Sequence, residues 1–168
     1  MEKILYIMCG VGFSGKSTLA KKISEHKQAA LVSQDAIYFE KEKELDPTLS
    51  SDKEWELIWN IAIERVVGYL KQGKSVVYDS TNTRREHRDR FRKIALENNA
   101  RAIVVYLNTP DEVLLARQMK NKETKERHDV KQEYLDQARA EMEIPQSDEN
   151  PIVFTPESDL VEWLDKLD

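Results

Sequence analysis

Cysteine is almost absent from this sequence, with one residue, Cys9, in 168, and glycine and proline are scarce at five residues each. A single cysteine cannot form an internal disulfide, which is typical of proteins from a reducing compartment. No repeat or low-complexity tract interrupts the chain, and no apolar run reaches the roughly 18 residues that a transmembrane helix needs. The short apolar run at residues 4–9 leads into a glycine loop, unlike a signal peptide. We therefore expect one cytoplasmic domain, residues 1–168, without a membrane partner.

An excess of positive charge is also missing. The formal net charge is −5, so no overall field attracts nucleic acid or acidic lipid, and a polyanion would need a local basic patch. One basic segment exists, consisting of Arg84, Arg85, Arg88, Arg90, Arg92 and Lys93. We interpret most of it as a solvated helix face, with the exception of Arg84, which lies nearest to the expected ligand crevice.

Short apolar runs alternate along the chain with segments of helical spacing. The runs lie at residues 4–9, 29–32, 75–78, 102–107 and 152–154. Continuous apolar runs of this length are typical of strands buried on both faces of a parallel sheet. The order β-α-β-α-α-β-α-β-α-α-β-α predicts an α/β fold with helices on both faces of that sheet.

Capping residues mark three helix starts. Ser51 and Glu54 can form a capping box for a helix that should stop near Gly73. Thr109, followed by proline, is the expected cap of a second helix, and Thr-Pro-Glu at 155–157 opens the last one. The residues expected to face the core are Trp55, Ile58, Trp59, Ala62, Val66, Tyr69 and Leu70 in the first helix, Val113, Leu114 and Met119 in the second, and Leu160, Val161, Leu164 and Leu167 in the third.

Residues 10–17 read Gly-Val-Gly-Phe-Ser-Gly-Lys-Ser, which matches the phosphate-loop pattern G-x-x-x-x-G-K-[ST] in full. Its glycines let backbone N–H groups converge on a β-phosphate, and the next helix adds its positive dipole end. Lys16 can reach the β- and γ-phosphates, while the Ser17 hydroxyl ligates Mg²⁺. We expect ATP with Mg²⁺, because no N-K-x-D segment marks guanine specificity. The residues expected to bind the nucleotide are Gly10, Gly12, Phe13, Ser14, Gly15, Lys16, Ser17 and Thr18.

Two aspartates follow the second and third predicted strands, whose carboxyl ends should border the ligand crevice. Asp35 is either a base that accepts a proton from an acceptor hydroxyl or the cap of a helix that starts at Ala36. Asp79 either holds Mg²⁺ through water or belongs to a turn at residues 79–82. Two carboxylates at adjacent strand ends, both beside one phosphate loop, favour the chemical interpretation.

The phosphate loop, Asp35, the Asp-Ser-Thr-Asn segment at 79–82 and Arg117 resemble the small P-loop kinases related to the 5′-polynucleotide kinase domain. The zeta-toxin and chloramphenicol phosphotransferase kinases belong to the same larger group. The resemblance runs from the first strand to the Arg127 region. It implies a P-loop NTPase fold with a five-stranded parallel sheet in the order 2-3-1-4-5 and a mobile lid. It also implies Asp35 as general base, Asp79 near the metal or acceptor, and lid arginines that neutralise the γ-phosphate, Arg117 being the first.

The sequence departs from this family pattern at three places. Gly12-Phe13 stands where the family often has Pro-Gly. Tyr38 occupies the position of an arginine that grips a nucleic-acid phosphate, and Asn121 that of a second lid arginine. The phosphotransfer machinery is thus better matched than the acceptor site, for which we name Asp35, Tyr38, Asn82 and Arg84.

A polar stretch at about 118–130, between two helices, has the composition of a flap that closes over the triphosphate. It includes Arg127, which we expect to cover the transferred group together with Arg117. The sequence predicts a kinase that moves the γ-phosphoryl group of ATP to the hydroxyl of a small molecule. Alternatives are a 5′-hydroxyl polynucleotide kinase and a nucleotide-binding regulatory protein with slow ATPase activity. Oligomeric state is not determined by these patterns.

Overall fold

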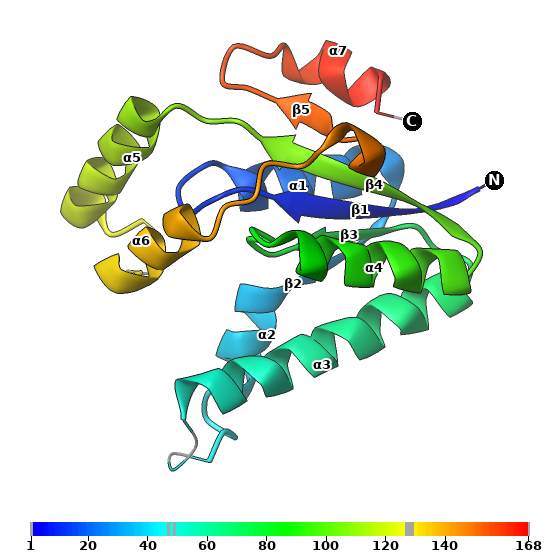
Figure 1. Cartoon of the computed structure of the whole chain (residues 1–168), viewed down its shortest axis with the longest axis horizontal. Coiled ribbons are helices and arrows are strands. Elements are labelled where there is room, and N and C mark those ends of the chain that lie inside the picture. Colours follow the sequence, from blue (N-terminus) through cyan, green and yellow to red (C-terminus); the bar gives the residue numbers. More distant parts are fainter. Residues whose placement is uncertain (1, 47, 49, 127–129, 168) are drawn as a thin grey trace.

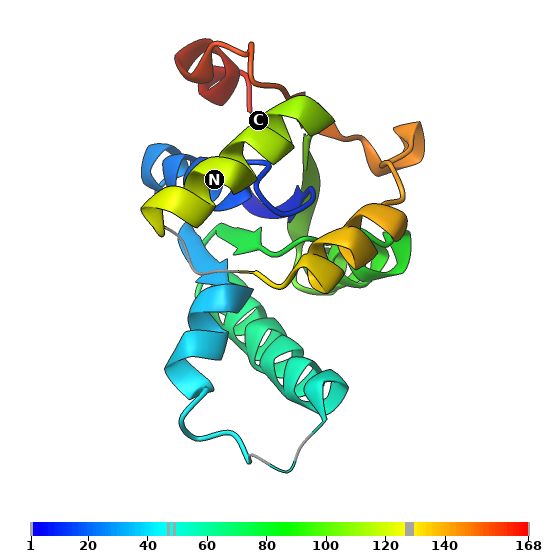
Figure 2. The same cartoon turned by 90° about the vertical axis from the view of Figure 1, so that its left-hand side faces the viewer.

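The computed structural model describes residues 2–46, 48, 50–126 and 130–167, and within them the chain forms one parallel sheet flanked by helices (Figures 1 and 2). The strands are β1 (Lys3–Cys9), β2 (Ala30–Ser33), β3 (Val76–Asp79), β4 (Ala100–Leu107) and β5 (Ile152–Phe154). The helices are α1 (Lys16–Lys27), α2 (Gln34–Lys41), α3 (Ser51–Lys71), α4 (Arg85–Glu97), α5 (Asp111–Thr124), α6 (Gln132–Ala140) and α7 (Leu160–Asp165), with a 3₁₀ turn η1 (Ser147–Glu149). The strand order is β2-β3-β1-β4-β5, which confirms the predicted fold.

Strand β1 lies at the centre of the sheet and divides the core into two layers. Its side chains alternate, so Tyr6 and Met8 pack toward α1 and α7, while Leu5 and Ile7 pack toward α3 and α4. Figure 1 shows α1 and α7 on one side of the sheet and α3 and α4 on the other. Burial of both faces explains the continuous apolar runs in the sequence. Among the described residues, no helix is long and apolar enough to cross a membrane.

Helix boundaries differ from the capping prediction by a few residues. Ser51 is the first residue of α3 and Ser50 is its cap, so the expected capping box is wrong, although the helix does end at Lys71, just before Gly73. Helix α5 begins at Asp111, one residue later than expected. Helix α7 begins at Leu160, because Asp159, and not the Thr-Pro-Glu segment, accepts the N–H of Glu162.

The predicted buried faces are largely correct. The buried residues of α3 are Ile58, Ala62, Val66 and Leu70, with both tryptophans and Tyr69 packed beside them. Two residues expected to face the core are exposed instead, Met119 by 66% and Val161 by 68%. In α5, Gln118 and Asn121 are buried in place of Met119, because this helix packs through polar contacts.

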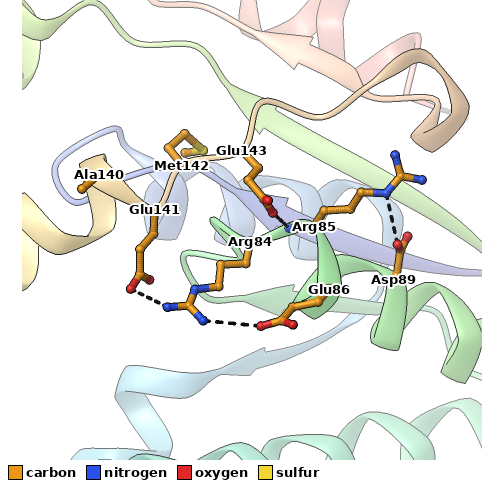
Figure 3. A pocket seen from close by; sticks show the side chains of 8 residues that line it. All are labelled: Arg84, Arg85, Glu86, Asp89, Ala140, Glu141, Met142 and Glu143. Atoms are coloured by element: carbon orange, nitrogen blue, oxygen red, sulfur yellow. Dashed lines mark hydrogen bonds and ion pairs between the residues drawn. The ribbon is translucent and has the colours of Figure 1, made fainter.

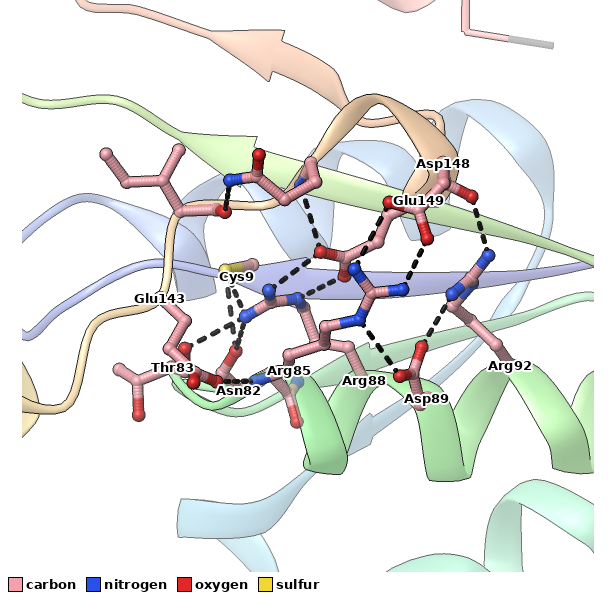
Figure 4. A network of polar contacts seen from close by, with 12 residues as sticks. Cys9, Asn82, Thr83, Arg85, Arg88, Asp89, Arg92, Glu143, Asp148 and Glu149 are labelled. Carbon is pink, nitrogen blue, oxygen red and sulfur yellow. Dashed lines mark hydrogen bonds and ion pairs between the residues drawn. The ribbon is translucent and has the colours of Figure 1, made fainter.

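The basic segment is solvated only in part, because Arg90 and Lys93 are exposed while Arg88 is completely buried. The side chains of Arg88 and Glu149 are both 0% exposed, and Arg88 Nε and Nη2 donate to the Glu149 carboxylate at 2.6 and 2.9 Å. Arg88 Nη1 donates to the carbonyls of Asn82 and Thr83 at 3.0 and 2.9 Å. The Gln146 N–H completes the shell around Glu149 at 3.0 Å. Figure 4 shows this network between α4 and the segment before β5.

Two neighbouring arginines extend the same connection at the surface. Arg85 pairs with Asp148 and with Asp89, and Arg92 donates to the Asp148 carbonyl at 2.8 Å. The segment that joins α6 to β5 is therefore attached to α4 along its length. The prediction of a solvated face was wrong for Arg88, because acidic residues about 60 positions away in the sequence fold onto this part of α4.

Stability should depend strongly on this buried pair. Burial alone would raise the pKa of Glu149, but the bonds from Arg88 and Gln146 outweigh it and lower that pKa. The pair's contribution is therefore present above the unfolded pKa of about 4.3 and is lost as pH falls through the folded value.

We predict that Arg88→Ala lowers the free energy of unfolding by roughly 3–5 kcal/mol, because it leaves a buried carboxylate without its partner. Urea unfolding at pH 7 measures the change. The matched control is Lys93→Ala on the same helix, whose ion pair with Glu97 is exposed and should matter little. Equal stabilities for the two variants would show that the buried pair is not a principal support of the fold.

Candidate functional site

The loop between β1 and α1 has the geometry of a phosphate cradle. Gly15 adopts φ 100° and Phe13 φ 65°, left-handed conformations that turn the backbone back on itself. Lys16 opens α1 and its Nζ donates to the Val11 carbonyl at 2.8 Å across the loop. The first N–H groups of α1 have no partner within the helix and lie at its positive end. The loop thus combines an ammonium group with backbone donors.

The Asp-Ser-Thr-Asn segment after β3 is tied directly to this loop. The Gly10 N–H donates to the Thr81 carbonyl at 3.0 Å, and Asn82 Nδ2 donates to the Met8 carbonyl at 2.7 Å. Asn82 is buried with φ 44°, so its side chain holds the end of β1. The structure thus gives Asn82 a supporting contact, and its predicted contact with substrate stays a prediction.

The two predicted carboxylates lie at the same edge of the sheet. Asp79 is the last residue of β3, is only 6% exposed, and stands opposite Ser33 in the parallel register. Asp35 follows Ser33 by two residues, in the first turn of α2, and is exposed. Ser33, not Asp35, caps α2, since its side chain accepts the Ala36 N–H. The capping interpretation of Asp35 was therefore wrong.

Gln34 fixes the helix that carries Asp35, a role that sequence reasoning missed. Its Oε1 accepts hydrogen bonds from the Tyr78 hydroxyl at 3.0 Å and the Ser80 hydroxyl at 2.5 Å. The first turn of α2 is thereby attached to the end of β3. On the next turn, Tyr38 stacks on Trp55 of α3, with ring centroids 5.0 Å apart and planes at 20°. Tyr38 thus places an aromatic ring about one helical turn after Asp35.

Helix α5 supports the loop from the other side. Arg117 Nη1 donates to the carbonyls of Phe13 and Ser14 at 3.1 and 2.9 Å. Thr109, expected as a helix cap, instead donates its hydroxyl to the Ser14 carbonyl at 3.1 Å. Arg117 is therefore brought to the phosphate loop as predicted.

The expected flap is shorter than its composition suggested. Helix α5 continues to Thr124, so Lys120 and Lys122 belong to a helix and not to a loop. Arg127 lies outside the described residues, and its predicted role stays a prediction.

The predicted acceptor arginine, Arg84, already has anionic partners. It donates to Glu141 at 2.6 Å and lies 3.5 Å from Glu86. Both contacts line a surface hollow of about 610 Å³, shown in Figure 3. The hollow is lined by Arg84, Arg85, Glu86, Asp89, Ala140, Glu141, Met142 and Glu143. Four carboxylates against two guanidinium groups make it net negative.

Cys9 lies beside the loop without reactive character. It is buried, and its Sγ donates to the Asn82 carbonyl at 3.4 Å. Burial raises the pKa of the thiol to about 11, even though Arg88 and Lys16 lower it. A thiolate is the reactive form, so Cys9 serves as packing.

The donors around the loop fit a nucleotide triphosphate with Mg²⁺. Within the described ranges, no group of three or more His, Cys, Asp or Glu side chains could hold a metal alone. Mg²⁺ prefers one or two protein oxygens plus phosphate oxygens, and the side chains of Ser17 and Asp79 carry oxygens that fit this preference. In the described part of the loop, the Ser14 hydroxyl is a buried polar atom without a hydrogen-bond partner.

The sheet order and the loop define the fold of the P-loop kinases. Residues 5–145 match the family AAA_33, described as an AAA domain. The chain belongs to this family. No curated protein sequence matches it at a significant level.

Three solved structures are similar over almost the whole chain. A proposed kinase from Chloroflexus aurantiacus J-10-fl has a TM-score of 0.77 and 18% identity, covering 99% of this chain and 97% of its own. Kti12 of Chaetomium thermophilum, solved with ADP-AlF3, has a TM-score of 0.75 and 16% identity, covering 97% and 96%. A gluconokinase from Sinorhizobium meliloti 1021 has a TM-score of 0.65 and 22% identity, covering 98% and 88%. These likenesses confirm the predicted fold.

We predict that Lys16→Ala lowers ATP turnover by at least about a hundredfold, because it removes a charge that should bind most strongly as charge shifts in the transition state. Labelled ATP measures the turnover. The control is Lys22→Ala on the same helix, an exposed residue 3.7 Å from Glu25, which should retain full turnover. Unchanged turnover in Lys16→Ala would place the reaction elsewhere.

Proposed function

We propose that this protein is an ATP-dependent kinase that transfers the γ-phosphoryl group to a hydroxyl of a small molecule. The observation that carries the proposal is the pair of carboxylates beside the phosphate loop. Asp79 ends β3 opposite Ser33, and Asp35 follows Ser33 by two residues. A slow regulatory ATPase needs a group that positions water, whereas a kinase needs a base open to an incoming acceptor. The exposed Asp35 meets the second requirement.

Each group has a distinct part in the proposed reaction. Lys16 and the N–H groups at the start of α1 hold the phosphates, and Ser17 and Asp79 hold Mg²⁺. When bound, Mg²⁺ neutralises developing charge on the phosphate oxygens. Asp35 accepts the proton of the acceptor hydroxyl, and Gln34 keeps its helical turn against β3. ADP-AlF3 in the Kti12 structure supports a nucleotide at this loop in the shared fold.

Arg117 has a supporting and a binding part in this proposal. Its Nη1 is occupied by the two loop carbonyls. Its Nε and Nη2 make no hydrogen bond within the described part of the chain, so they remain for a phosphate oxygen. Arg117 therefore orients the loop while it contributes charge to the nucleotide.

The acceptor side favours a small molecule over a polynucleotide. A polynucleotide needs cations for its phosphates, and arginine is the favoured partner. Here Tyr38 stacks on Trp55, and Arg84 is paired with Glu141 in a net negative hollow. A small polyhydroxylated compound needs no such cations, and the similar gluconokinase carries an activity of that class in its name.

We predict that Asp35→Asn lowers phosphoryl transfer by about 10²–10⁴-fold while ATP affinity and melting temperature stay nearly unchanged. Asparagine keeps the shape but cannot accept the proton. Ser33→Ala is the informative control, because it removes the true cap of α2 and should cost about 1 kcal/mol of stability. A collapse of stability in Asp35→Asn would refute the assignment of Asp35 as the base.

We predict that small hydroxyl compounds are preferred over 5′-hydroxyl oligonucleotides as acceptors. The measurement is a competition assay with labelled ATP at low and moderate salt, with both kinds of acceptor present. Efficient labelling of the oligonucleotide that falls steeply with salt and is abolished by Arg84→Ala would establish the polynucleotide kinase alternative.

A further inference from the structure

One of the two lid arginines of the family pattern is replaced in this chain. Asn121 stands where a second lid arginine was expected, and its side chain is buried in α5. One guanidinium nitrogen of Arg117 already donates hydrogen bonds to the loop carbonyls. The structure offers another arginine near the loop, on α6.

Helix α6 lies directly on the phosphate loop. Leu135 is the buried residue of this helix, at 4% exposure. A Cβ atom on Gly12 would come within 2.4 Å of Leu135 Cδ2, so the two residues are in close contact. Gln118 Nε2 also donates to Gln132 Oε1 at 2.6 Å, which joins α5 to α6. The face of α6 that carries Leu135 is therefore the face turned toward the loop.

Arg139 lies one turn beyond Leu135 on that same face. It is half-buried and lines a hollow of about 240 Å³ that also includes Val11 of the phosphate loop. Asn108 and Thr109, which follow β4, and Asp111, the first residue of α5, also line this hollow. Asp111 makes no ion pair with Arg139 in this part of the described structure.

Arg139 differs from the other described arginines in having no partner. Carboxylates pair with Arg65, Arg84, Arg85, Arg88, Arg92 and Arg101. Arg117 bonds to loop carbonyls, and Arg90 lies 4.4 Å from the centroid of the Trp59 ring. Within residues 2–46, 48, 50–126 and 130–167, the Arg139 guanidinium has no hydrogen bond or ion pair. Partial burial of an unpaired charge is costly, so a site that keeps one is suited to an anion.

Contacts between the segment just after α6 and the start of α4 fix the position of Arg139. Just after α6, Glu141 pairs with Arg84 and the Glu143 N–H donates to the Thr83 carbonyl at 3.0 Å. Figure 3 shows the contact between Glu141 and Arg84 beside the end of α6. With Leu135 packed on Gly12 at the other side, the helix is held at both ends of its loop-facing surface. A cation held in advance in this way stabilises developing charge without reorganisation.

We propose that Arg139 binds the γ-phosphate of the nucleotide and thereby contacts the transferred group. The proposal rests on the proposed function, since it requires a triphosphate in the loop. Its guanidinium supplies N–H donors to phosphate oxygens that a diphosphate lacks. Arg139 is thus a catalytic residue that neither the spacing of the motifs nor the family resemblance indicated.

The test compares the affinities of AMPPNP and ADP, each with Mg²⁺, by calorimetry. We expect Arg139→Ala to weaken AMPPNP by roughly ten- to a hundredfold, as for a lost hydrogen bond to a charged group, and to leave ADP within about twofold. Arg139→Lys should retain part of the AMPPNP affinity, because it keeps the charge but not the planar fork. The matched control is Arg101→Ala, an exposed arginine paired with Glu2 at the other end of the sheet, which should alter neither affinity.

Two results would overturn the proposal, and they differ in what else they refute. Equal changes for AMPPNP and ADP in Arg139→Ala, including no change in either, would refute the assignment of Arg139 and leave the proposed function standing. A wild-type protein that binds neither nucleotide would refute both. Melting temperatures of all variants, measured without nucleotide, separate a lost contact from a damaged fold.

Discussion

The buried ion pair of Arg88 and Glu149 is the interaction on which the arrangement of the site depends. It joins α4, which begins just after the Asp-Ser-Thr-Asn segment, to the chain that follows α6. Arg88 also bonds to the carbonyls of Asn82 and Thr83, so the same guanidinium holds the segment that lies against the phosphate loop. One buried group thus connects the loop, the Asp79 segment and the helix that covers the loop. Removing either buried partner is costly in free energy, so the folded protein strongly favours this connection.

Most of the described arginines of this protein pair with carboxylates of the same chain. Arg84, Arg85 and Arg88 pair with Glu141, Asp148 and Glu149, which lie far away in the sequence and close in space. A basic segment read from the sequence resembled a surface for polyanions or solvent, and neither interpretation describes Arg88. Among the residues that the structure describes, the cations nearest to the phosphate loop are Lys16, Arg117 and Arg139. Such a site suits a triphosphate more than a long polyanion.

Most of the fold could be predicted because it follows from local patterns. The apolar runs locate the five strands within two residues, and the family resemblance supplies their order. The phosphate loop, Asp35 and Asp79 are marked by a motif or by their place at strand ends. The roles of Gln34 and Glu149, and the bond from Thr109 to the phosphate loop, were missed because these contacts join distant segments. Helix caps such as Ser50 and Asp159 were misplaced because several neighbouring residues have the same capping chemistry.

The direct junction between β2 and α2 has a consequence for how this protein can change over evolution. Strand β2 ends at Ser33 and α2 begins at Gln34, so no loop separates the sheet from the turn that carries Asp35. An insertion or deletion there would rotate the carboxylate away from the crevice. The far end of α2 and the start of α3 are joined by a longer connection, residues 42–50, which tolerates changes in length. The length of that connection can therefore change over evolution while the position of Asp35 relative to β2 is inherited unchanged.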